Sequence, residues 1–105
     1  MNHHRVQQLQ QLLKAEPNDC FLHHALGVEY LSCEKYDDAI AAFRKVLSLD
    51  ENYLASYYQL GDTLVKTGAT SEAMQIYKIG IEIAKKQGNA KAFGELSQAL
   101  WLLED

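Results

Sequence analysis

The chain has 105 residues, and its 14 acidic and 10 basic side chains give a net charge of −4. This acidic balance argues against a nucleic-acid partner, because neutralising phosphates requires a basic face. No stretch approaches the roughly 20 apolar residues of a membrane span, and the N-terminus lacks the apolar core of a signal peptide. We therefore expect one small cytoplasmic domain with no membrane or nucleic-acid partner.

Six helices are predicted in chain order from the spacing of apolar residues and from the stop signals between them. They span about residues 2–15, 19–32, 36–49, 53–66, 70–86 and 90–103. Pro17 ends the first helix, because proline disfavours a helical residue before it. Asn18 or Asp19 can cap the second helix, and Gly68 can close the fourth in the left-handed conformation. No segment alternates at period two for long enough to be a strand, so the predicted fold class is all-α.

A step of 34 residues relates two parts of the chain. Leu26-Gly27 recurs as Leu60-Gly61, Ala39 recurs as Ala73, and Phe43 recurs as Tyr77. A fixed period of this size indicates stacked helix pairs, since each pair cannot bury its apolar face alone. We predict a single domain over residues 1–105, with an N-terminal helix (1–17), two repeats (20–53 and 54–87) and a C-terminal capping helix (88–105).

Glycines inside the predicted helices need an explanation. Gly27 and Gly61 each cost about 1 kcal/mol relative to alanine in a helix interior. Close approach of the partner helix would offset this cost, with Ala39 and Ala73 as equally small surfaces. Gly80 is predicted to contact the sixth helix, and a kink in the fifth helix is the alternative.

These features resemble the tetratricopeptide repeat family, whose motif places Leu-Gly in a first helix and an alanine and an aromatic in a second. The copies read His23-x-x-Leu26-Gly27-x-x-Tyr30 with Ala39-x-x-x-Phe43, and Tyr57-x-x-Leu60-Gly61-x-x-Leu64 with Ala73-x-x-x-Tyr77. The resemblance covers about residues 3–103 and implies an α-solenoid of antiparallel helix pairs with a right-handed superhelix.

Each end of the chain resembles half of a further repeat. The sixth predicted helix reads Phe93-x-x-Leu96-Ser97-x-x-Leu100, which is similar to a first helix shifted by two residues. The first predicted helix resembles the second helix of an upstream repeat, with Leu9, Leu12 and Pro17 in register. Trp101-Leu102-Leu103 is then either the apolar face of a capping helix or an uncovered patch that favours self-association.

The resemblance implies a protein–protein interaction module that binds a peptide or protein segment in a concave groove, without catalysis. Helix periodicity selects the side chains that would face this groove: Phe21, His24, Val28, Leu31, Tyr58, Gln59, Asp62, Lys66, Lys91, Glu95, Gln98 and Trp101. The alternative is a self-assembling structural subunit that dimerises through its terminal helices. We therefore expect a monomer or a weak homodimer.

A subgroup of the family that binds chaperone tails clamps a terminal carboxylate with lysine, arginine and asparagine. Lys91 matches one clamp lysine, whereas Glu95 and Val28 replace the arginine and the asparagine. A carboxylate would be repelled by Glu95, so this activity is not expected.

Catalytic and metal-binding patterns are not evident in the sequence. The pairs His3-His4 and His23-His24 are adjacent, and neighbours on a helix point about 100° apart, unlike the ligands of a zinc site. Cys20 and His24 are one turn apart, but oxyanion donors and an enclosed pocket are missing from the pattern. Cys20 and Cys33 are interpreted as free thiols. We expect no enzyme activity, no metal and no cofactor.

Overall fold

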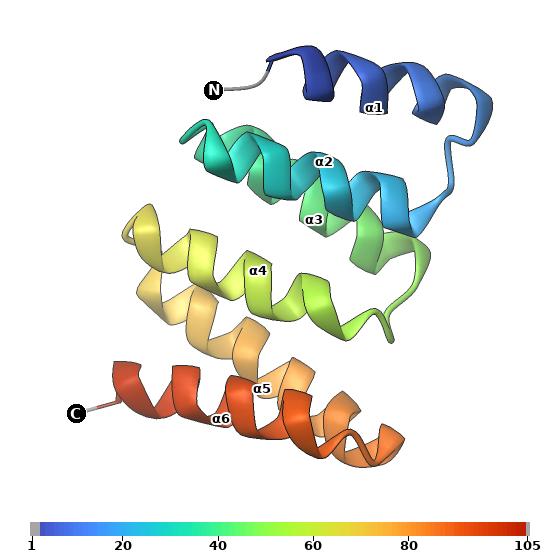
Figure 1. Cartoon of the computed structure of the whole chain (residues 1–105). Helices are drawn as coiled ribbons and strands as arrows, with labels where there is room; N and C mark the ends of the chain where they lie inside the picture. Colours follow the sequence, from blue (N-terminus) through green and yellow to red (C-terminus); the bar gives the residue numbers. More distant parts are fainter. Residues whose placement is uncertain (1–2, 105) are drawn as a thin grey trace. The chain divides into compact units, whose positions relative to one another are not determined.

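The computed structural model describes residues 3–104, which form six α-helices and no strand. The helices are α1 (His3–Ala15), α2 (Cys20–Ser32), α3 (Tyr36–Leu49), α4 (Leu54–Lys66), α5 (Thr70–Gln87) and α6 (Ala90–Leu103) (Figure 1). The all-helical prediction is confirmed, and the expected start of the first helix at residue 2 lies outside the described residues. Within residues 3–104, no helix is long and apolar enough to cross a membrane.

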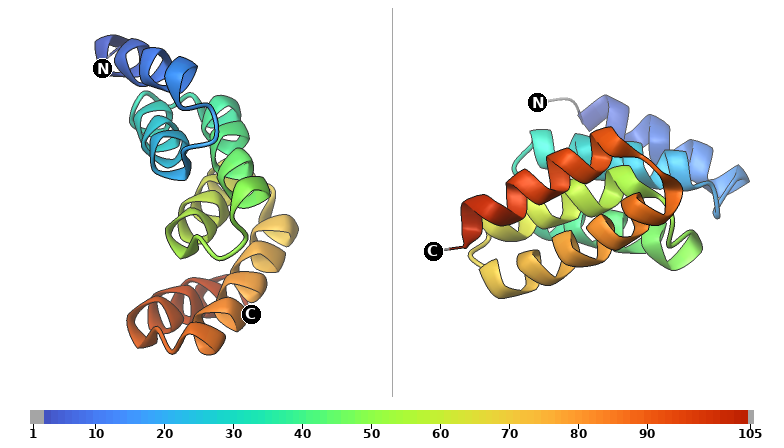
Figure 2. Two further views of the ribbon diagram at one scale, coloured as in Figure 1. Left: turned by 90° about the vertical axis from the view of Figure 1, so that its right-hand side faces the viewer. Right: turned by 90° about the horizontal axis from the view of Figure 1, so that it is seen from below.

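The chain divides into two compact units, one over residues 1–53 with α1–α3 and one over residues 54–105 with α4–α6. In unit 1, α2 packs against both α1 and α3, and in unit 2, α5 packs against α4 and α6 (Figure 2). Neighbouring helices in each unit run antiparallel, because the loops between them are short (Figure 1).

The α2–α3 pair of unit 1 is closed by an aromatic ring lying on a glycine. Phe43 is fully buried, and a Cβ atom added at Gly27 would lie 2.5 Å from Phe43 Cε1. Ala39 is also fully buried, but the atoms nearest Gly27 are those of the Phe43 ring. The Phe43 ring thus occupies the space over Gly27, and Ala39 is buried in the same helix pair.

Unit 2 repeats this contact one period later. A Cβ atom at Gly61 would overlap the ring of Tyr77, lying 2.7 Å from its Cδ1 atom. At Gly80, an added Cβ would lie 2.9 Å from Tyr57 Cβ and 3.0 Å from Leu96 Cδ1. Gly80 therefore lets α5 approach both α4 and α6, as predicted for α6, and α5 runs through it as one helix.

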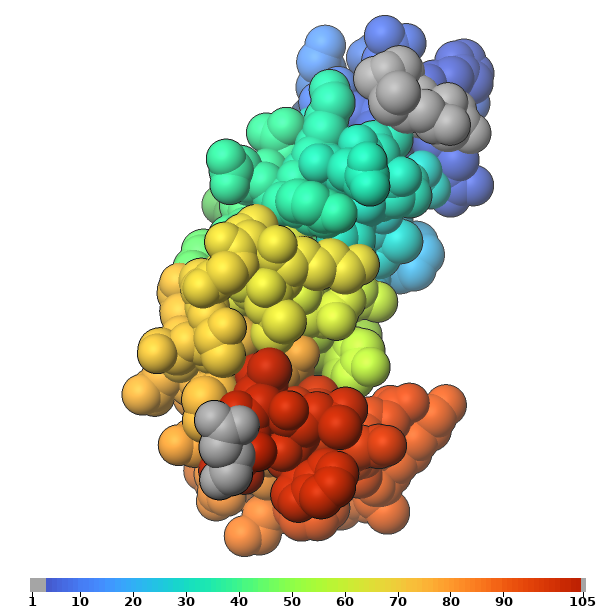
Figure 3. Space-filling model, turned by 90° about the vertical axis from the view of Figure 1, so that its left-hand side faces the viewer, coloured from blue at the N-terminus to red at the C-terminus, as the bar shows by residue number. Residues whose placement is uncertain are grey.

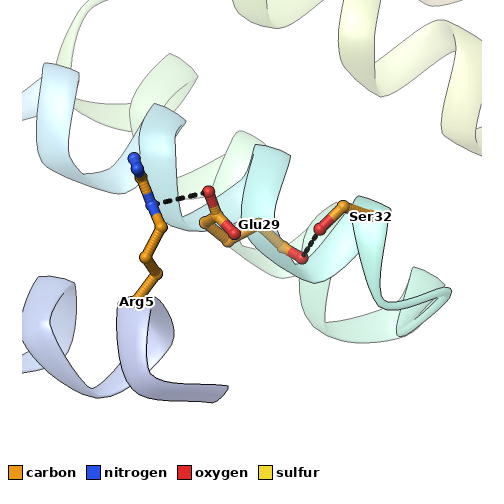
Figure 4. Close-up of polar contacts among 3 residues, drawn as sticks. All are labelled: Arg5, Glu29 and Ser32. Atoms are coloured by element: carbon orange, nitrogen blue, oxygen red, sulfur yellow. Dashed lines mark hydrogen bonds and ion pairs between the residues drawn. The ribbon is translucent and has the colours of Figure 1, made fainter. Parts of the chain in front are cut away.

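Polar contacts join α1 to α2 in unit 1 (Figure 4). Arg5 Nε lies 2.9 Å from Glu29 Oε1, and Gln10 Nε2 donates to the Tyr30 hydroxyl at 3.0 Å. Ser32 Oγ donates to the backbone carbonyl of Glu29 at 2.7 Å. The Glu29 side chain is 16% exposed, so its ion pair is better shielded from solvent than a fully exposed one.

Two side chains cap the starts of helices, and two glycines lie at the ends of others, with Asp19 and Gly68 in the predicted roles. The Asp19 carboxylate accepts from the Leu22 amide at 3.0 Å, and Asn89 Oδ1 accepts from the Ala92 amide at 3.0 Å. Gly88 closes α5 in the left-handed conformation at φ 67°, and Gly68 has φ 85°. These residues therefore mark where α2 and α6 begin and where α4 and α5 end.

Candidate functional site

Two hollows lie between α4 and α6 of unit 2. The first, of about 200 Å³, is lined by Leu54, Ala55, Tyr58, Asn89, Lys91, Ala92 and Glu95. The second, of about 380 Å³, is lined by Tyr58, Asp62, Val65, Tyr77, Gln98, Ala99, Leu102 and Leu103. Because Tyr58 lines both, the hollows form one groove along the two helices, which we call the α4–α6 groove. Figure 3 shows the last turn of α6 (red) beside the end of α4 (yellow) on one face of unit 2.

Helix periodicity explains which residues of α4 line this groove. Tyr58, Asp62 and Val65 are separated by four and three residues, so they share one face of the helix. The neighbouring face carries Leu60 and Leu64, which are 1% and 3% exposed and belong to the core. Packing and groove residues are thus on different faces of the same helix.

The groove combines an exposed aromatic ring with carboxylates from both helices. Tyr58 is 41% exposed, with Asp62 four residues later on α4 and Glu95 contributed by α6. The Asp62 carboxylate also lies 3.8 Å from Lys66 Nζ. The second hollow adds the apolar side chains of Val65 and Leu102. The groove therefore combines an aromatic ring, charged groups of both signs and apolar side chains.

Tyr77 of α5 forms part of the wall of the second hollow and is only 3% exposed. Burial, together with smaller contributions from the charges of Asp62 and Tyr58, raises the pKa of its hydroxyl to about 12. The phenol is therefore neutral at physiological pH.

The raised pKa of Tyr77 predicts a loss of stability at alkaline pH. An unfolded tyrosine loses its proton near pH 10, whereas the folded protein holds it to about 12, so the free energy of unfolding falls as pH rises between these values. Urea unfolding at pH 9 and at pH 12 should show Tyr77→Phe losing about 2 kcal/mol less than the unmodified chain. An equal loss in both proteins would contradict the assignment.

The groove prediction and the structure overlap in part within unit 2. Five of the predicted residues line the hollows, namely Tyr58, Asp62, Lys91, Glu95 and Gln98. Gln59, Lys66 and Trp101 do not line either hollow, although Lys66 contacts the carboxylate of Asp62. Sequence reasoning missed Val65 and Leu102. Val65 lies seven residues after Tyr58, and Leu102 lies seven residues after Glu95, so helix periodicity was sufficient to find both. It also missed Tyr77, which the repeat pattern assigns to packing.

The four residues predicted for α2 lie in unit 1. Phe21 and Val28 are 66% and 37% exposed, whereas His24 and Leu31 are partly buried. The ring of His24 lies 5.4 Å from that of Phe43 and 5.5 Å from that of Tyr53, measured between centroids. Burial lowers the pKa of His24, so its imidazole is neutral at physiological pH. His24 thus takes part in the packing of unit 1.

The two cysteines are free thiols in the structure. Burial raises the pKa of Cys20, with smaller contributions from the charges of Asp50 and Asp19, so this thiol is protonated at neutral pH and is a weak nucleophile. Among residues 3–104, no three histidine, cysteine or acidic side chains come together as a metal site would require. The side chain of His3 lies outside what the structure describes.

Antiparallel helix pairs closed by a glycine–aromatic contact at a fixed period define a helical-repeat protein. Family models for "TPR repeat" and "Tetratricopeptide repeat" match residues 27–68 and 54–87. The chain belongs to the tetratricopeptide repeat family.

Comparison with known proteins supports this assignment. A tetratricopeptide repeat domain protein from Salinibacter ruber is 32% identical, and the match covers 81% of this chain and 94% of that chain with a TM-score of 0.77. Mouse Superkiller complex protein 3 is 32% identical over 91 residues, and the match spans 86% of this chain but only 6% of that protein. The first repeat domain of Spaghetti (RPAP3), bound to the HSP90 peptide SRMEEVD, shares the fold at 19% identity and a TM-score of 0.76, covering 93% of this chain and 76% of that chain.

Proposed function

We propose that this chain is a protein-interaction module that binds a peptide or protein segment in the α4–α6 groove, without catalysis. The observation that carries the proposal is the position of Tyr58, which is 41% exposed and lines both hollows between the helices. Exposed aromatic rings in grooves are frequent anchors of protein interfaces. The Spaghetti domain, which has the same fold, binds a peptide, and this supports the proposal.

The charges of the groove favour a partner segment with a basic side chain next to an apolar one. The lining holds the carboxylates of Asp62 and Glu95 and the ammonium group of Lys91, and Lys66 lies 3.8 Å from the Asp62 carboxylate. An arginine or lysine stacked on Tyr58 would lie near both carboxylates, and an apolar side chain would fit beside Val65. An acidic tail such as SRMEEVD would be repelled by Glu95.

The exposed face of α2 is a second candidate surface, which lies within unit 1. Phe21 and Val28 are exposed there, on the helix that carries the same repeat positions as α4. Within unit 1 we propose a separate contact surface, with Phe21 and Val28 as its exposed side chains beside the partly buried His24 and Leu31.

A peptide-display experiment tests the groove. Peptides selected from a random library against the full chain should contain a basic residue next to an apolar one, and Tyr58→Ala should weaken their binding by at least about 10-fold in fluorescence anisotropy. Asp62→Asn should weaken the same peptides, because it removes one carboxylate near the basic side chain.

Ile79→Ala is the matched control, because Ile79 is 47% exposed but lies on α5, outside both linings. This variant should bind the selected peptides as the unmodified chain does. If the peptides bind Tyr58→Ala as tightly as the unmodified chain, the α4–α6 groove is not the binding site.

A further inference from the structure

The imidazole ring of His24 packs against two aromatic rings of unit 1. Its centroid lies 5.4 Å from that of Phe43 and 5.5 Å from that of Tyr53, with the ring planes tilted by 55° and 46°. Phe43 belongs to α3 and is fully buried, whereas Tyr53 is the last residue of unit 1 and directly precedes α4 in the chain. His24 therefore joins α2 to the turn that follows α3.

Hydrogen bonds within this turn, over residues 50–53, give it a defined shape. The Asp50 amide donates to the Val46 carbonyl at 2.8 Å, and the Tyr53 amide donates to the Asp50 carbonyl at 3.2 Å. The Asn52 amide donates to Asp50 Oδ1 at 2.9 Å. These three bonds are local, so they do not connect the turn to α2. The contact between the rings of Tyr53 and His24 makes such a connection.

The surroundings of His24 favour its neutral form. Burial lowers the pKa of the imidazole, because a charged ring would lose hydration that its aromatic neighbours do not replace. The ring that α3 presents to it is uncharged. Burial also raises the pKa of Tyr53, with smaller contributions from three neighbouring charges, namely Cys20, Asp19 and Asp50. The attraction of the two carboxylates for an imidazolium does not outweigh burial, since the pKa of His24 is lowered.

We propose that His24 and Tyr53 form an acid-sensitive latch, in which protonated His24 leaves the two rings for solvent and releases the 50–53 turn from α2. The open latch binds a proton more tightly than the closed one, because an imidazole in solvent has a pKa of about 6.5. The closed form therefore has its full stability above about pH 6.5 and loses stability as the pH falls from there through the lowered pKa of His24. One period later Tyr58 replaces the imidazole with a phenol, so the latch belongs to unit 1 and is independent of the proposed peptide binding.

Amide hydrogen exchange followed by NMR tests the latch in the full chain. Between about pH 7.5 and 5.5, exchange of the Tyr53 amide, corrected for the intrinsic effect of pH, should rise several-fold and by no more than about 10-fold. The limit follows from the uptake of one proton by an open form whose imidazole has a pKa of about 6.5. The rise should follow the titration of the His24 ring resonances, and the Ile79 amide in α5 should show no such rise.

Two variants separate the latch from other effects of pH. His24→Phe keeps an aromatic ring without a titrating group, so exchange of the Tyr53 amide should lose its pH dependence. His23→Gln is the matched control, because it removes the neighbouring histidine, whose Nε2 lies 2.8 Å from the Pro17 carbonyl oxygen. This variant should keep the pH dependence of the unmodified chain.

A third variant tests the contact from the other side. Tyr53→Leu should move the titration midpoint of His24 towards about 6.5, because it removes one of the rings that bury the imidazole. Circular dichroism checks folding, and Tyr53→Leu decides the matter if His24→Phe does not fold, since an unchanged midpoint would contradict the latch. The same pH dependence in His24→Phe as in the unmodified chain, or a His24 that titrates with no change at the Tyr53 amide, would each overturn the proposal.

Discussion

Replacing Gly61 with leucine is expected to destabilise the chain by about 3 kcal/mol or more, because no space exists for a side chain at this position. Even a single added carbon atom would overlap the ring of Tyr77, and that ring is only 3% exposed and cannot move into solvent. Urea unfolding followed by circular dichroism measures the loss as a lower midpoint.

Gly94→Ala is the matched control for Gly61→Leu. Gly94 also lies inside a helix, but a Cβ atom added there meets nothing within 4 Å. Alanine should therefore stabilise the chain by about 0.5–1 kcal/mol, from helix propensity alone. If both variants unfold at the midpoint of the unmodified chain, the glycine–aromatic contact does not close the helix pair.

Truncating Phe43 to alanine should cost about 3–5 kcal/mol in unit 1. Its ring is fully buried, lies on Gly27 and is 5.4 Å from the ring of His24, so removing it leaves a cavity between α2 and α3. Phe21→Ala removes the same number of atoms from a side chain that is 66% exposed, and should change stability by no more than about 0.5 kcal/mol. Similar losses for the two variants would place the core of unit 1 elsewhere.

The helices could be predicted from the sequence because their signals are local. Pro17, the Asp19 cap and Gly88 act within one turn of the chain, and apolar spacing then fixes the face that each helix buries. The contact over Gly27 was harder to predict, because the motif names Ala39 and Phe43 together and only the packed pair shows that the ring takes the space. This packing contact depends on two helices at once, so the signals within one helix do not predict it.

The candidate site was predictable only where one helix supplies it. Tyr58 and Asp62 follow from the periodicity of α4, but the contribution of Tyr77 from α5 needs the assembled unit. His24 and Tyr58 lie one period apart, yet His24 packs against Phe43 and Tyr53 while Tyr58 is exposed. The same repeat position thus stabilises one unit and is available for recognition in the other.

The division between repeating and non-repeating residues connects the fold with the proposed function. The repeating positions, such as Gly61 and Tyr77, are buried and hold each helix pair together. The groove positions differ between the repeats, with Val28 on α2 where Asp62 stands on α4. Partner specificity should therefore be changed by mutation in the groove without loss of stability.

Chemical-shift mapping tests the proposed binding site most directly. A peptide selected against the unmodified chain is titrated into the ¹⁵N-labelled protein, and the amide resonances are followed by NMR. We expect the largest shifts at Tyr58, Asp62, Glu95 and Gln98, which line the α4–α6 groove. Shifts confined to the outer face of α5 around Ile79, with the Tyr58 amide unchanged, would contradict binding in this groove.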